Sequence, residues 1–137
     1  MASLHKRLVF ARPARVDLGL LLLRLWFGLV LALAHGLHKL GNLQGFVSAV
    51  EQNGIPLPLP SAVFAVLGEL VGGTLLALGL FTRAAGLSVA ATLSVAAFWV
   101  HRADPFAKME FALAYAVVGL ALAITGPGRF SLDGKRR

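Results

Sequence analysis

The chain carries a carboxylate and a guanidinium inside stretches that are otherwise apolar. Glu69 stands within the apolar run 64–74, and Arg24 stands within an apolar segment that begins near residue 17. An ionised group that faces lipid costs roughly 2.5–3.5 kcal/mol, so each should point into the protein and meet a partner. Because the forked guanidinium matches a carboxylate, we predict a buried pair between Arg24 and Glu69. Such a pair also fits a purely structural role, since buried ion pairs set helix pairing and register.

A second polar group lies near the other ends of the apolar segments and consists of His35, His101 and Glu110. At 1.5 Å of rise per residue, these side chains share a depth of roughly 24–27 Å, above Glu69 at roughly 18 Å and Arg24 at roughly 10 Å. Imidazoles and a carboxylate at one level can hydrogen-bond a carbonyl ligand, transfer protons or bind a metal. We predict ligand contact or proton transfer in preference to a metal.

His38 follows His35 at a spacing that places both rings on one side of a helix, but this spacing alone does not specify a metal site. We therefore expect no bound metal. The predicted ligand-binding residues are Arg24, His35, His38, Glu69 and His101, and the predicted proton-handling residues are His101, Glu110 and Glu69. His38, Lys39, Arg102 and Asp104 also fit a bland interpretation as solvated residues at the membrane surface, because long charged side chains reach water near the ends of spans.

The composition indicates that membrane helices must position these groups. Of the 137 residues, 58% are apolar and 14% are charged, whereas soluble domains average about 45–50% and 25%. Four apolar segments, at about 17–37, 61–81, 84–100 and 110–126, each approach the length that crosses a hydrocarbon core about 30 Å thick. We predict an all-α integral membrane protein, a four-helix antiparallel bundle with a short interfacial helix in the first outer loop, 41–60.

The basic residues predict the orientation of this bundle in a bacterial inner membrane. They concentrate before the first span, at Arg83 and after the last span, which places both termini in the cytoplasm. The predicted organisation is a basic arm at 1–16, a transmembrane domain at 17–126 and a basic tail at 127–137. The first segment also resembles a signal peptide, but its length and Arg24 favour a retained span.

Small residues and prolines predict how the spans pack and connect. Gly68, Gly72 and Gly73 form a small surface that lets another helix backbone approach beside Glu69. Asn53 and Gly54 can end the interfacial helix, and the alternating prolines of 55–60 favour an extended backbone.

Charge and cysteine content exclude several functions. The net charge of +7 sits at chain ends and span junctions, so we expect membrane lipids as partners and no nucleic acid. The chain has no cysteine, so redox chemistry would need a bound cofactor or a partner.

Several short motifs occur in order along the chain: Leu22-Leu-Arg24, His35-Gly-Leu-His-Lys39, Gly54-Ile-Pro-Leu-Pro, Glu69-Leu-Val-Gly-Gly, Gly79-Leu-Phe-Thr-Arg83, His101, Glu110 and Gly126-Pro-Gly-Arg129. Taken together they resemble the DoxX family of small membrane proteins over about residues 17–133. The family often has Gln where this chain has His38, which favours hydrogen bonding over metal binding there. The resemblance implies a four-helix bundle associated with redox physiology, because relatives include the membrane subunit of a quinone-reducing thiosulfate oxidoreductase.

Two hypotheses follow. In the first, an outer cavity binds a quinone-like head group, His35 or His101 donates to a carbonyl, Glu69 or Glu110 moves protons, and a partner supplies electrons. In the second, the protein is a non-catalytic anchor or assembly subunit that binds another protein subunit or forms a homo-oligomer. An open cavity favours the first hypothesis, and polar groups collapsed into ion pairs favour the second. A small transporter fits less well, because four short spans leave little room for two access states.

Overall fold

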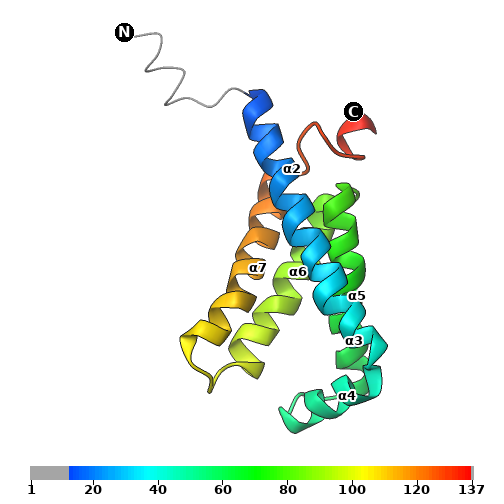
Figure 1. Ribbon diagram of the computed structural model, residues 1–137, viewed down its shortest axis with the longest axis vertical. Helices are drawn as coiled ribbons and strands as arrows, with labels where there is room; N and C mark the ends of the chain where they lie inside the picture. Colours follow the sequence, from blue (N-terminus) through cyan, green and yellow to red (C-terminus); the bar gives the residue numbers. More distant parts are fainter. Residues whose placement is uncertain (1–12, 137) are drawn as a thin grey trace.

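The computed structural model describes residues 13–136, and every regular element in that range is a helix. Four helical segments are long and apolar enough to cross a membrane: Ala14–Gly41, Pro58–Leu78, Thr82–Val100 and Phe106–Thr125. They run alternately up and down in Figure 1. The predicted four-helix membrane architecture is therefore confirmed, while residues 1–12 of the predicted arm lie outside the described residues.

Two of the spans are interrupted by π-helix. The first consists of α2 (Pro13–Val30), the π-helical stretch η1 (Leu31–Gly36) and α3 (Leu37–Gly41), and the third consists of α6 (Thr82–Val95) and the π-helical stretch η2 (Ala96–Val100). The second and fourth spans are the uninterrupted helices α5 (Pro58–Leu78) and α7 (Phe106–Thr125). A π-helical stretch shifts the register of the residues that follow it and is frequent at functional sites. Neither stretch was predicted from the sequence.

The predicted interfacial helix is α4 (Leu43–Gln52), which lies across one end of the bundle in Figure 1. Asn42 caps it by accepting a 3.3 Å hydrogen bond from the Gly45 N–H. Helix α4 ends at Asn53 and Gly54, and Gly54 has a φ of +70°. The expectation of an extended backbone through residue 60 is wrong, because α5 begins at Pro58, where the fixed φ of proline suits the first helical turn.

Glycines allow two pairs of helices to touch backbone to backbone. A Cβ on Gly28 of α2 would lie 2.6 Å from the carbonyl oxygen of Gly73 on α5. A Cβ on Gly86 of α6 would lie 2.5 Å from the carbonyl oxygen of Gly119 on α7. Both distances are too short for a side chain, so these approaches require glycine. Gly73 therefore makes the close helix–helix contact that was predicted for the glycines of α5, and the neighbouring helix is α2.

The chain after α7 folds back along the bundle. Leu132 and Asp133 donate their N–H groups to the carbonyls of Leu78 and Gly79, at 3.3 and 2.9 Å. The Asp133 carboxylate in turn accepts from the N–H groups of Phe81 and Thr82, at 3.1 and 3.0 Å, which satisfies otherwise free donors at the start of α6. The chain then closes with the 3-10 helix η3 (Gly134–Arg136).

The bundle thus has two unlike ends. The start of α2 and the end of the chain lie together at the top of Figure 1, which we call the terminal end. Helix α4 and the connection between η2 and α7 lie at the bottom, which we call the loop end. The orientation of these ends across a membrane stays a prediction.

Candidate functional site

Arg24 and Glu69 do not pair, so this prediction is wrong. The side chain of Arg24 is fully buried and donates from Nη1 to the carbonyls of Leu76 and Ala77, both at 3.4 Å, and from Nη2 to the carbonyl of Phe130. The last carbonyls of a helix lack partners within it and carry partial negative charge, so the end of α5 attracts the guanidinium. The folded-back chain supplies the third acceptor, which a search for carboxylates could not reveal.

Glu69 pairs with Lys39 instead. The Lys39 ammonium donates to Oε1 of Glu69, whose side chain is only 2% exposed. The second carboxylate oxygen, Oε2, is buried and has no hydrogen-bond partner among the described residues. The interpretation of Lys39 as a solvated surface residue is therefore wrong. The π-helical register shift in η1 precedes Lys39 and changes the face on which the following residues lie.

A cavity of about 130 Å³ opens beside this pair at the loop end. Its lining combines apolar, aromatic and ionisable side chains from all four spans and from the residues that follow η2. Both π-helical stretches contribute to it. The lining residues are Leu31, His35, Lys39, Glu69, Leu93, Ala96, His101, Lys108, Phe111, Ala112 and Tyr115.

Aromatic rings form one wall of the cavity. The His35 ring lies 5.8 Å from both the Phe111 and Tyr115 rings, and Phe27 meets Tyr115 nearly edge to face at 5.2 Å. These contacts hold the imidazole and the Tyr115 ring in place, since ring pairs at such distances attract one another. Tyr115 was not predicted as a site residue. It is the only tyrosine of the chain, and its position four residues after Phe111 on α7 was the available signal.

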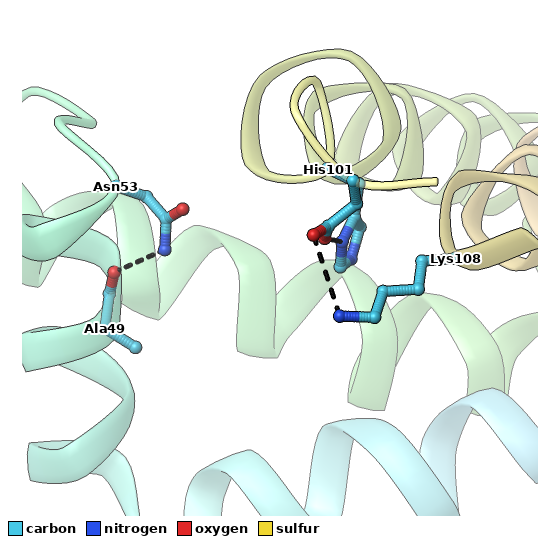
Figure 2. A network of polar contacts seen from close by, with 5 residues as sticks. Ala49, Asn53, His101 and Lys108 are labelled. Carbon is cyan, nitrogen blue, oxygen red and sulfur yellow. Dashed lines mark hydrogen bonds and ion pairs between the residues drawn. The ribbon is translucent and has the colours of Figure 1, made fainter. Parts of the chain in front are cut away.

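Asp104 connects two of the cavity's basic residues. His101 Nδ1 lies 2.7 Å from one oxygen of Asp104, and Lys108 Nζ lies 3.6 Å from the other. Figure 2 shows the His101 ring and Lys108 converging on this carboxylate. The hydrogen bond from His101 lowers the pKa of Asp104 below its ordinary value, and the charge of Lys108 adds to the effect. Asp104, interpreted as merely solvated, therefore orients two residues that line the cavity.

Helix α4 is tied to the same region. The indole Nε1 of Trp99 in η2 donates to the carbonyl of Asn53 at 3.3 Å, while the Asn53 side chain donates to the carbonyl of Ala49 at 2.8 Å (Figure 2). These bonds fasten the end of α4 to the end of the third span. The interfacial helix thus braces the end of the bundle that contains the cavity.

The structure brings together three of the predicted site residues, His35, Glu69 and His101, as lining residues of one cavity. Glu110 and His38 are exposed and do not line it. Helix α7 presents Lys108, Phe111, Ala112 and Tyr115 to the cavity, a spacing typical of one helical face, and Glu110 lies off that face. The predicted convergence of Glu110 with the two histidines is therefore wrong.

The DoxX family model matches residues 19–102. A Bacillus subtilis (strain 168) protein named "Putative oxidoreductase CatD" is 33% identical over 118 residues, which cover 85% of this chain and 86% of that protein. The "Inner membrane protein YphA" of Escherichia coli (strain K12) is 35% identical over 107 residues, covering 72% and 76%. No solved structure shows a significant match. Because the family model spans more than half of the chain and these relatives extend the likeness, this protein belongs to the DoxX family of membrane proteins.

Proposed function

We propose that the loop-end cavity binds the head group of a quinone-like carbonyl compound as substrate and supplies protons for its reduction. The protein would do so in a bacterial inner membrane with both termini in the cytoplasm. The observation that carries this proposal is the surplus of hydrogen-bond donors around a cavity of ring size. The oxidoreductase name of the B. subtilis relative is consistent with it.

The size of the cavity supports a single-ring ligand. Its volume of about 130 Å³ is close to the ~150 Å³ of an engineered apolar cavity that binds benzene. The walls formed by Leu31, Leu93 and the aromatic rings suit the two faces of such a ring. A bulkier isoprenoid chain would then extend toward the surrounding lipid.

The donors suit a ligand that only accepts hydrogen bonds. His35, His101, Lys39, Lys108 and Tyr115 can all donate, while Glu69 already accepts from Lys39. A quinone carbonyl has no proton of its own, and reduction by two electrons builds negative charge on both oxygens. Ammonium and imidazole donors placed before the reaction stabilise that charge without reorganising.

The proton path of the proposal uses His101 and Glu69. With its Nδ1 held by Asp104, His101 keeps Nε2 as the ring nitrogen available to a ligand. Glu69 lines the cavity, and its buried Oε2 has no hydrogen-bond partner among the described residues, so this carboxyl is the second group of the proposed proton path. Two electrons and two protons convert a quinone to a quinol, and a redox partner subunit supplies the electrons, because this chain has no cysteine.

The Lys39–Glu69 pair by itself also favours the alternative of a membrane anchor or assembly subunit. It joins α3 to α5 and would fix helix register without any ligand. The anchor alternative does not explain why His35 and Tyr115 line an open cavity and have no ion-pair partner among the described residues. We therefore favour the ligand-binding function.

Equilibrium binding of a ubiquinone with a single isoprenoid unit to the purified protein in nanodiscs tests the proposal. We expect His101→Ala to weaken binding about tenfold, the loss of one charge-assisted hydrogen bond. The matched control is Glu110→Gln, which removes an ionisable group at the same end but outside the cavity. Equal binding by wild type and His101→Ala, or equal losses in both variants, would contradict the proposal.

A further inference from the structure

A second hollow, of about 340 Å³, lies at the terminal end and is lined by Arg83, Arg129, Asp17 and the backbone after α7. It has no part in the proposed quinone chemistry, since it lies at the opposite end of the bundle from His101. Arg83 comes from the first turn of α6, and Arg129 comes from the folded-back chain. We call this cavity the arginine hollow.

The two arginines are available to a ligand. Within the part of the chain that the structure describes, neither guanidinium has a hydrogen-bond or ion-pair partner. The acid of the hollow, Asp17, uses one carboxylate oxygen to accept the Arg129 N–H at 3.0 Å. The charges of these three side chains sum to one excess positive charge.

Gly126 leaves room beside Arg83. A Cβ on Gly126 would stand 3.6 Å from both Nε and Nη2 of Arg83, so the guanidinium lies directly against this part of the backbone. The positive φ values of Gly126 and Gly128, +83° and +73°, turn the chain around the hollow. An anion in the hollow would therefore meet the edge of the Arg83 guanidinium that carries Nε and Nη2.

The position of the hollow indicates where such an anion comes from. It lies where α6 begins and α7 ends, the level at which both helices leave the apolar part of the bundle. Phe81 and Phe130 are exposed at this end, at 63% and 52%, so apolar rings that suit the acyl boundary of a membrane stand beside the charged hollow. The head-group phosphates of a lipid leaflet occupy that level.

We propose that the arginine hollow binds the phosphodiester of an anionic glycerophospholipid. Arginine binds phosphate oxygens through two parallel hydrogen bonds, and one phosphodiester charge balances the excess charge of the hollow. A zwitterionic lipid brings an ammonium group toward the same arginines and is disfavoured. The expected ligand is phosphatidylglycerol in preference to phosphatidylcholine.

Native mass spectrometry of the full chain with phosphatidylglycerol or phosphatidylcholine tests this. We expect preferential retention of phosphatidylglycerol, weakened about fivefold by Arg83→Gln or Arg129→Gln and about thirtyfold by both, because each basic residue near a lipid surface contributes comparably. Lys135→Gln is the matched control at the same end, since Lys135 does not line the hollow, and Arg102→Gln is the control at the loop end. Both controls should change retention less than twofold.

Three outcomes would overturn the proposal. Equal loss in Lys135→Gln would mean diffuse attraction to surface charge. Full displacement of phosphatidylglycerol by excess inorganic phosphate would mean that a free anion, and not a lipid, is the ligand. Unchanged retention in the double variant, with thermal unfolding showing an intact fold, would mean that the arginines do not bind the head group.

Discussion

The two ends of the bundle bury ionic groups in opposite ways. At the terminal end, both Nη atoms of Arg24 donate to backbone carbonyls, the folded-back chain covers the guanidinium, and only the buried Nε has no partner among the described residues. At the loop end, Glu69 shares one oxygen with Lys39 and keeps the other without a partner among the described residues, beside an open cavity. At the terminal end, the buried guanidinium joins α2, α5 and the end of the chain. At the loop end, polar side chains remain available to a ligand.

Arg24→Leu should have the largest effect on stability, because it removes the buried contacts that hold the terminal end together. The substitution removes the side-chain donor of the Leu76, Ala77 and Phe130 carbonyls, of which Leu76 keeps the Gly79 N–H, and it removes a contact between α2, α5 and the end of the chain. We expect a loss of about 2–5 kcal/mol, because each buried acceptor that is left without a donor costs about 1–3 kcal/mol. Thermal unfolding in detergent, with Arg102→Leu at an exposed position as control, measures it. A melting temperature equal to that of the wild type would show that the contacts of the Arg24 guanidinium do not stabilise the terminal end.

The Lys39–Glu69 pair should matter less, because Lys39 is one-quarter exposed and reaches water when its partner is lost. A double-mutant cycle with Lys39→Met and Glu69→Leu should give a coupling energy within about 0.5–3 kcal/mol. Glu69→Gln should destabilise less than Glu69→Leu, since the amide keeps an acceptor for the ammonium. The control cycle combines Arg24→Leu with Glu69→Leu. We expect the two losses of stability to add, because these side chains do not contact each other. A strong coupling energy would mean that Arg24 and Glu69 form a pair after all.

Asp133→Ala tests how firmly the chain end is fastened. The variant removes the acceptor for the N–H groups of Phe81 and Thr82 at the start of α6, and such capping losses cost about 0.5–2 kcal/mol. Asp133→Asn should retain part of the stability, because the amide oxygen still accepts one bond. Limited proteolysis of the segment after α7, followed by mass spectrometry, should show faster cleavage in the Ala variant. Cleavage at the wild-type rate would contradict the capping role.

The membrane class, the helical spans and the short helix α4 could be predicted, because apolar run lengths and turn residues act locally. Three of the site residues, His35, Glu69 and His101, could also be predicted from type and depth. Their partners could not. Arg24 pairs with carbonyls, which every residue has and which no sequence pattern marks.

The helical register explains why other residues of the cavity were not predicted. The π-helical stretch η1 shifts the faces that the residues of α3 present, so Lys39 lines the cavity while His38 is exposed. Glu110 was placed by its depth, and neither depth nor helical spacing determines which face of α7 turns toward the cavity. The face that does line the cavity carries Lys108, Phe111 and Tyr115.

The smallest expected effect is a pH dependence of stability that arises at the loop end. Asp104 lies outside the spans and its pKa is lowered from the ordinary 3.8, chiefly by the hydrogen bond from His101. A carboxyl whose pKa is lower in the folded state stabilises the fold fully above 3.8, and that contribution disappears as the pH falls through the lowered pKa.

Asp104→Asn should therefore lower the melting temperature slightly at neutral pH, and the difference from the wild type should shrink only below the ordinary carboxyl pKa of 3.8. Glu51→Gln, at an exposed position on α4, controls for the general loss of a negative charge at this end. Melting temperatures measured in one detergent from neutral to strongly acidic pH give the comparison. A difference that is absent at neutral pH and appears only on acidification would contradict this prediction, because it would mean that the contact between Asp104 and His101 requires a charged imidazole.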